Sequence, residues 1–145
     1  MNAKHTVLYA DDDIDDIQLL TEVFEDHTEN IEFITFSNGL ELLAYLKNLQ
    51  PNQSLPCLVI LDINMPLLNG TDTLVRIRDI EKFKDIPVIM FTTSSSQRDK
   101  DFAFKYNAGF FTKPINYVQL ETVANILISQ CNEPIRDQVR KQKVK

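Results

Sequence analysis

Short apolar runs alternate with amphipathic segments along this 145-residue chain, and that alternation constrains its fold more than any other feature. The apolar runs are mostly continuous, which predicts strands of a sheet that is covered on both faces. The segments between them repeat apolar residues every three or four positions, which predicts helices. We expect strands at residues 5–10, 31–36, 57–61, 87–92 and 109–112, and helices at 13–26, 38–49, 71–83, 94–107 and 114–130.

Five strand–helix units in succession predict a doubly wound α/β domain with right-handed crossovers. This pattern uses the chain up to about residue 130. The remainder, residues 131–145, is expected to be a basic C-terminal tail without a separate output domain, because so few residues cannot form a second core.

The residues that end the predicted strands carry the chemistry, because ligand sites of open parallel sheets lie at the carboxyl ends of the strands. These strand ends hold Asp11, Asp12 and Asp13, then Asp62, then Thr92, Thr93 and Ser94, and finally Lys113. Clustered carboxylates repel one another, and a divalent cation such as Mg²⁺ relieves that repulsion. With a lysine nearby, the set suits phosphoryl transfer, with one carboxylate left as a nucleophile that forms an acyl phosphate.

Each of these features also has a structural explanation when taken alone. Asp13 is typical of a helix N-cap, and Asp15 and Asp16 are expected on a solvated helix face. Residues 92–96 would cap the next helix, and Lys113 alone would be a surface lysine. The arrival of such residues at four strand ends of one sheet favours a functional site.

Four segments together resemble the receiver domain of two-component response regulators: residues 7–13 (VLYADDD), 61–70 (LDINMPLLNG), 90–94 (MFTTS) and 110–114 (FFTKP). The resemblance covers about residues 5–130. Within that family the chain is similar to stand-alone receivers of the chemotaxis-regulator type, including partners of bacterial phytochrome kinases. The resemblance implies a flavodoxin-like (βα)5 sandwich with a parallel five-stranded sheet in the order 2-1-3-4-5.

The same resemblance implies a phosphoacceptor and a metal site. Asp62 would be the phosphoacceptor. Mg²⁺ would be bound by Asp12, by Asp62 and by the backbone carbonyl of Asn64, while Asp11 would act mainly through water.

The resemblance further assigns residues to phosphoryl binding and to the response. Thr92 would donate a hydrogen bond to one phosphoryl oxygen, and Lys113 would pair with another. Phe110 matches the switch aromatic of the family, without the hydroxyl of the common tyrosine. The Lys113–Pro114 bond is expected to be cis, which proline permits.

The implied function is that of a single-domain response regulator. It would accept a phosphoryl group from a sensor histidine kinase or a phosphotransfer protein and would catalyse only its own phosphorylation and dephosphorylation. The signal would leave by protein contact through the helix at 94–107, the strand at 109–112 and the helix at 114–130. The partner on that face would be either a second copy of the chain, giving a homodimer, or a different protein.

Charge and hydropathy limit the other partners. Residues 136–145 carry five basic side chains against one acidic one, so within a net charge of −6 the rest of the chain carries −10. Such an acidic body disfavours DNA as a partner. No apolar run approaches the roughly 20 residues that span a bilayer, and the N-terminus lacks a secretory signal, so we expect no membrane association and a cytoplasmic protein.

The two cysteines are too few for a disulfide framework. Cys57 opens an apolar run and is expected to be a reduced thiol in the core.

Three other functions stay open at this point. A flavodoxin-like FMN binder would need a phosphate-binding loop where Asp11–Asp13 stand. A phosphatase of the haloacid-dehalogenase type would place its nucleophile after the first strand rather than at Asp62. A binding module without phosphoryl chemistry is the third alternative.

Overall fold

Five parallel strands form one sheet in this computed structural model, which describes residues 5–27, 31–113 and 116–132. The strands are β1 (His5–Ala10), β2 (Ile31–Phe36), β3 (Leu58–Leu61), β4 (Val88–Thr92) and β5 (Gly109–Thr112). The helices are α1 (Ile14–His27), α2 (Gly39–Lys47), α3 (Gly70–Asp79), α4 (Gln97–Lys105) and α5 (Tyr117–Asn132). The sheet order is β2-β1-β3-β4-β5, which confirms the predicted fold and strand order.

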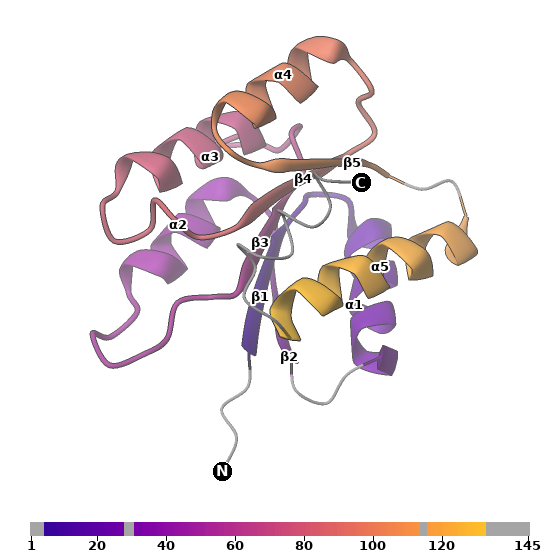
Figure 1. The fold of residues 1–145 in the computed structure, drawn as a ribbon, viewed down its shortest axis with the longest axis horizontal. Helices are drawn as coiled ribbons and strands as arrows, with labels where there is room; N and C mark the ends of the chain where they lie inside the picture. Colours follow the sequence, from indigo (N-terminus) through magenta and orange to yellow (C-terminus); the bar gives the residue numbers. More distant parts are fainter. Residues whose placement is uncertain (1–4, 28–30, 114–115, 133–145) are drawn as a thin grey trace.

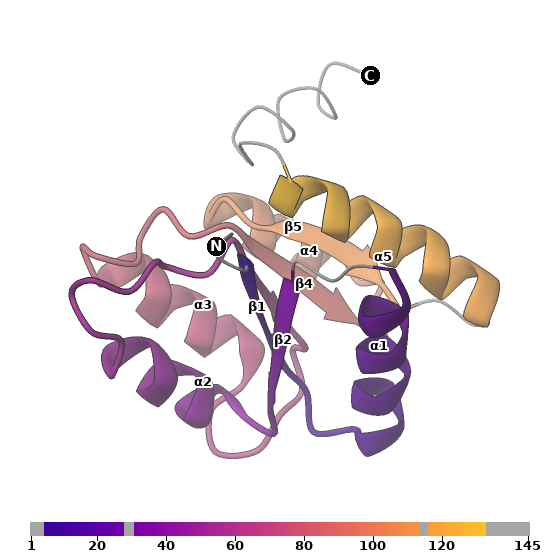
Figure 2. The same ribbon diagram turned by 90° about the horizontal axis from the view of Figure 1, so that it is seen from below.

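The helices form a layer on each face of the sheet. Helices α1 and α5 lie side by side on one face, and α2, α3 and α4 cover the other (Figure 1; Figure 2). Every residue of β3 and β4 is buried, whereas the edge strands β2 and β5 are partly exposed. The continuous apolar runs of the central strands therefore have the cause that was inferred from the sequence, namely two covered faces.

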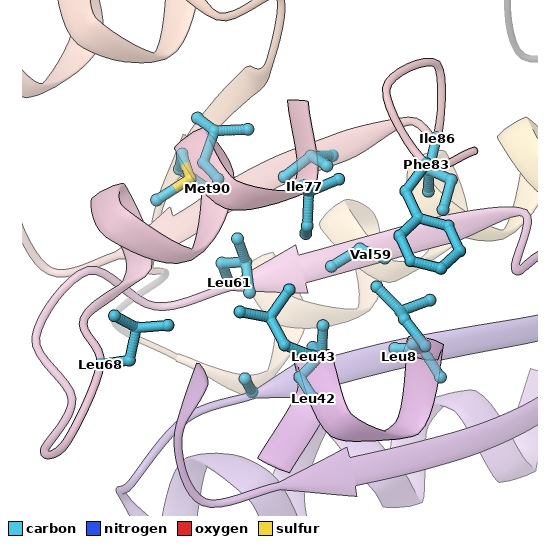
Figure 3. Close-up of a cluster of buried hydrophobic side chains, with 14 of the residues drawn as sticks. Leu8, Leu42, Leu43, Val59, Leu61, Leu68, Ile77, Phe83, Ile86 and Met90 are labelled. Carbon is cyan, nitrogen blue, oxygen red and sulfur yellow. The ribbon is translucent and has the colours of Figure 1, made fainter. Parts of the chain in front are cut away.

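Alternate residues of the strands supply two separate cores. Leu8, Val59 and Leu61 face the layer of α2 and α3, where Figure 3 shows them beside Leu42 and Ile77. Their chain neighbours point to the other face and pack with α1 and α5. The two cores hold the strand ends in register, and the functional residues depend on that register.

Two side-chain caps and one residue in a left-handed conformation define three of the helix ends. The side chain of Asn38 accepts a hydrogen bond from the Glu41 N–H at 3.0 Å and starts α2. Ser96 accepts one from the Asp99 N–H at 3.2 Å and starts α4. Asn107, two residues after the end of α4, has a φ of 59°, a left-handed conformation that is common after helices.

The predicted ends of three helices are wrong, since α4 spans Gln97–Lys105 rather than residues 94–107. Helix α3 ends at Asp79 rather than at residue 83, and successive turns then bury Phe83 and Ile86 without helix. The Arg78 guanidinium holds these turns by donating to the carbonyls of Lys84 and Ile86 at 3.0 and 2.7 Å. Helix α2 likewise ends at Lys47, two residues before the predicted end.

The start of α5 is also later than predicted. Asn116 caps this helix, since its side chain accepts a hydrogen bond from the Gln119 N–H at 3.0 Å. Residues 114 and 115 lie outside the described part of the chain, and so does the Lys113–Pro114 bond that was expected to be cis.

Cys57 is not a reduced thiol, because it forms a disulfide with Cys131. Cys57 immediately precedes β3, and Cys131 lies in the last turn of α5, with their Cα atoms 5.5 Å apart. The prediction failed because 74 residues separate the two cysteines, and only the packing of α5 across the sheet brings its end to the start of β3.

Two further sequence predictions concern the ends of the chain and the membrane. The predicted basic tail falls mainly in residues 133–145, which lie outside the described residues. Within the described ranges, no helix has the length and apolar character that a bilayer crossing requires.

Candidate functional site

The ends of β1, β3, β4 and β5 bring the predicted site residues to one edge of the sheet. Ala10 and Leu61 are paired in register, and the Asp62 N–H donates to the Ala10 carbonyl at 3.0 Å. On the other side, the Lys113 N–H donates to the Thr92 carbonyl at 2.7 Å. Backbone pairing thus fixes the positions from which the functional side chains project.

Three carboxylates form a cluster at this edge. One oxygen from each of Asp11, Asp12 and Asp62 lies within 4.8 Å of the other two. Asp11 and Asp62 are buried, whereas Asp12 is exposed. This set of hard oxygen donors, open to solvent on the Asp12 side, fits a divalent cation that keeps several waters.

Both carboxylate oxygens of Asp11 already accept hydrogen bonds. Its Oδ1 accepts from the Asp13 N–H at 2.9 Å, and its Oδ2 accepts from the Tyr9 hydroxyl and from Lys113 Nζ. Burial of the Tyr9 hydroxyl and the adjacent Asp11 charge raise the pKa of Tyr9 far above its usual value, so this phenol stays a donor. The engagement of Asp11 agrees with a role through water rather than as a direct metal ligand.

Lys113 contacts three carboxylates. Its Nζ lies 2.7 Å from Asp11 Oδ2, 2.7 Å from Asp16 Oδ2 and 3.4 Å from Asp62 Oδ2. Burial opposes the charge of the ammonium, but the hydrogen bonds to Asp11 and Asp16 outweigh it and raise the pKa of Lys113 above its usual value. Lys113 is therefore a protonated, largely buried cation rather than a surface lysine.

The prediction that Asp16 lies on a solvated face is wrong. Asp16 is in the first turn of α1, four residues before the buried Leu20, and it lies on the side of the helix that faces the site. The helical spacing to Leu20 was the sequence signal that could have identified it. The accompanying prediction for Asp13 is confirmed, because its side chain accepts from the Asp16 N–H at 3.1 Å.

Asp62 lies at the centre of the cluster and is only 6% exposed. Its Oδ1 accepts a hydrogen bond from the Ile63 N–H at 2.8 Å, and its Oδ2 has the longer contact with Lys113. Burial and the Asp11 charge raise the pKa of Asp62 to about 6, although Lys113 and the Ile63 N–H act in the opposite direction. The unneutralised carboxylate is thus destabilised in its site.

Gly70 permits the backbone around Asp62 to pack closely against α3. A Cβ atom at Gly70 would lie 2.0 Å from the Asp62 carbonyl oxygen, and the Gly70 N–H donates to the Ile63 carbonyl at 2.8 Å. In the structure, no larger residue fits there without displacing the segment that carries Asp62.

The remaining predicted residues surround this centre. Thr92 is fully buried, and its Oγ1 accepts a hydrogen bond from the Ser94 N–H at 3.3 Å. Asn64 is exposed in the loop that follows β3. Phe110 is partly buried against the core under α2, α3 and α4, whereas Phe111 packs with the core under α1 and α5.

The family of the chain follows from comparison with known proteins. Residues 7–125 match the family model of the response regulator receiver domain, so the chain belongs to that family and is a response regulator of two-component signalling. Receiver domains bind a divalent metal and have a histidine kinase or a phosphotransfer protein as their partner. The predicted resemblance is thereby confirmed.

Two individual members of the family are similar to this chain over most of its length. Response regulator Rcp1 of Synechocystis sp. is 30% identical over 122 residues, which cover 82% of this chain and 83% of Rcp1. Stress response regulator protein 1 of Meyerozyma guilliermondii is 30% identical over 138 residues, which cover 90% of this chain but only 60% of that protein.

Solved structures support the same subgroup. The phosphorylated cyanobacterial phytochrome response regulator RcpA has a TM-score of 0.81 and 28% identity, with 90% of this chain and 96% of RcpA covered. The Mn²⁺-bound form of Rcp1 has a TM-score of 0.74 and 28% identity, with 83% and 88% covered. The predicted similarity to receivers of phytochrome kinases is confirmed.

Proposed function

We propose that this protein accepts a phosphoryl group on Asp62 from a phosphohistidine of a sensor kinase or phosphotransfer protein, in a reaction that requires Mg²⁺. The observation that carries the proposal is the position of the buried Asp62, which lies 3.4 Å from Lys113 and in one cluster with Asp11 and Asp12. Phosphoryl transfer is catalysed mainly by positioning the reacting groups and by neutralising the charge of the phosphoryl oxygens, and this cluster can do both.

Asp62 is the best nucleophile among the three carboxylates. Asp11 has both oxygens occupied by short hydrogen bonds, and Asp12 is exposed to water. Among the hydrogen bonds of the described residues, Asp62 Oδ2 takes part in the long, 3.4 Å contact with Lys113. This oxygen attacks the phosphorus atom, the phosphorus–nitrogen bond breaks with its electron pair passing to the imidazole, and an acyl phosphate forms on Asp62.

Lys113 and Thr92 bind the transferred group. The Lys113 ammonium, which lies 3.4 Å from Asp62 Oδ2, donates to one phosphoryl oxygen. The Thr92 hydroxyl turns from the Ser94 N–H to donate to a second oxygen. On this proposal the protein catalyses only its own phosphorylation and dephosphorylation.

The metal site uses oxygen donors of three residues. Asp12 and Asp62 would hold Mg²⁺ together with the backbone carbonyl of Asn64, and Asp11 would act through water because its oxygens are occupied. The bound cation supplies positive charge to the phosphoryl oxygens. The structural similarity to the Mn²⁺-bound form of Rcp1 supports the binding of a divalent ion.

The phosphorylated state is transmitted through α4, β5 and α5. Movement of Thr92 toward the phosphoryl group leaves space that Phe110 can fill from its partly buried position. We place the receiver domain at residues 5–130 and the basic tail at 131–145, and we propose no contact with DNA. One proposed output is a homodimer that forms through α4, β5 and α5. Light scattering with and without beryllofluoride tests whether phosphorylation promotes this dimer.

Incubation with Mg²⁺ and a small phosphodonor tests the proposed function. We expect one base-labile phosphoryl group, which peptide mapping by mass spectrometry assigns to Asp62. Chelation of the metal is expected to prevent uptake. A protein that stays folded and takes up no phosphoryl group from either a phosphodonor or a phosphorylated kinase would instead be a binding module.

A further inference from the structure

The ammonium of Lys113 has all three of its N–H donors directed at carboxylates. Two contacts, to Asp11 and Asp16, are 2.7 Å long, and the third, to Asp62, is 3.4 Å. An ammonium has no fourth donor. A phosphoryl oxygen on Asp62 can therefore gain Lys113 only if one of these contacts weakens.

Asp16 differs from the other two carboxylates in its surroundings. Asp11 is fully buried and is fixed by the Tyr9 hydroxyl and the Asp13 N–H, and Asp62 is the phosphoacceptor. The side chain of Asp16 is 32% exposed and comes from α1 rather than from a strand end. Among the contacts of Lys113 it is the one that can be exchanged for water at the lowest cost.

Asp16 also adds negative charge to a site that must receive a phosphoryl group. Its Oδ2 lies as close to Lys113 Nζ as that of Asp11 does, so it draws the ammonium away from Asp62. The longer distance from Lys113 to Asp62 agrees with this pull.

We propose that Asp16 is a positioning residue that competes with the phosphoryl group for Lys113. In the unphosphorylated protein it holds the ammonium on the α1 side of the site, and phosphorylation moves Lys113 from Asp16 toward Asp62. This inference rests on the proposed function. It predicts that Asp16 lowers the affinity of the site for a phosphoryl group.

Asp15 provides a matched control for Asp16. Both residues are in the first turn of α1, so their replacement by asparagine removes the same charge from the same helix end. Asp15 is exposed, and no contact joins it to Lys113. A difference between the two variants therefore reports the contact with Lys113 rather than the helix dipole or the net charge.

The first measurement is a titration with beryllofluoride, a phosphoryl mimic, in saturating Mg²⁺. We expect Asp16→Asn to bind it roughly three- to tenfold more tightly than the wild type, and Asp15→Asn to change the affinity by less than about twofold. Asp16→Glu, which keeps the charge, is expected to restore most of the wild-type affinity. Equal or weaker binding by Asp16→Asn would overturn the inference.

A second measurement needs neither metal nor phosphoryl mimic. In the metal-free protein, acetylation of Lys113 by acetic anhydride is followed by mass spectrometry. We expect faster acetylation in Asp16→Asn and no change in Asp15→Asn, because only the first variant frees the ammonium. Unchanged acetylation in both variants would overturn the inference. The two measurements can also disagree. If the wild type fails to bind beryllofluoride while Asp16→Asn is still acetylated faster than Asp15→Asn, the proposed function is contradicted and the pairing of Asp16 with Lys113 is supported.

Discussion

The Oδ2 atom of Asp62 lies 3.4 Å from the Nζ atom of Lys113, although 51 residues separate them and a complete strand, β4, lies between theirs. The contact is set by two strand ends that both stop at the same edge of the sheet. The parallel register places each side chain independently, so either can be replaced without removing the scaffold of the other.

Replacement of Lys113 by alanine is expected to slow phosphorylation of Asp62 by about a hundredfold, because it removes the cation that faces the developing charge. Mg²⁺ affinity should be retained, since Lys113 donates no metal ligand. Phosphodonor kinetics and calorimetric Mg²⁺ titration measure the two effects. Lys47→Ala, at an exposed position in the last turn of α2, is the control, and an unchanged rate in Lys113→Ala would refute the assignment.

Replacement of Asp12 by alanine is expected to weaken Mg²⁺ binding by orders of magnitude. Asp12 contributes an exposed carboxylate to the cluster with Asp11 and Asp62, and it is the member best placed for direct contact with a hydrated ion. Asp15→Ala removes the same charge outside the cluster and should leave binding nearly unchanged. Superimposable Mg²⁺ titrations of Asp12→Ala and the wild type would exclude Asp12 as a ligand.

The raised pKa of Asp62 predicts how pH affects stability without metal. The pKa rises from 3.8 to about 6 on folding, so between these values the folded protein binds more protons than the unfolded chain. The free energy of unfolding therefore falls as pH rises from about 4 to about 6, and the penalty persists above that range. Asp62→Asn removes the penalty and should raise the free energy of unfolding at pH 7 by about 1–3 kcal/mol.

Urea unfolding in the presence of a chelator measures this effect. The gain of Asp62→Asn over the wild type should be large at pH 7 and should shrink as the pH falls, until Asp62 is protonated in both states below its unfolded pKa of 3.8. A variant that is less stable than the wild type at pH 7 would show that the carboxylate is not destabilised by its burial beside Asp11.

The Cys57–Cys131 disulfide predicts a redox dependence of stability. The bond closes a loop across 74 residues of sequence separation, for which chain entropy gives roughly 4 kcal/mol of stabilisation. Cys131→Ser should lose about that amount under oxidising conditions, and a reductant should bring the wild type close to the variant. The double replacement of Cys57 and Cys131 by serine should cost no more than the single one. A wild type whose unfolding is unaffected by reductant would contradict the bond.

The sequence predicted the parts of the site that depend on strand ends. A parallel sheet brings the carboxyl ends of its strands to one edge whatever the loops do, so Asp11, Asp62, Thr92 and Lys113 could be grouped before any coordinates were seen. The structure places these four residues at that edge. The family was identified separately, from the resemblance of four sequence segments to receiver domains, and the family model confirms it.

The features that were missed depend on packing between elements distant in sequence. Cys57 and Cys131 meet because α5 packs on the sheet with its C-terminal end beside the start of β3. No local sequence pattern encodes that packing. The end of α3 depends on Arg78 reaching the carbonyls of the following turns. Asp16 is different, because its four-residue spacing from the buried Leu20 indicates the inward side of α1. The neighbouring acidic residues made this segment look like a solvated helix face.

A comparison of phosphoryl uptake by the wild type and by Asp62→Asn decides whether Asp62 is the phosphoacceptor. Wild-type protein and the variant are incubated with Mg²⁺ and acetyl phosphate, and intact mass spectrometry follows the phosphorylated fraction, with circular dichroism confirming that both are folded. We predict one base-labile phosphoryl group on the wild type and none on Asp62→Asn. Uptake by the variant at the wild-type rate would contradict it and would place the phosphoacceptor elsewhere.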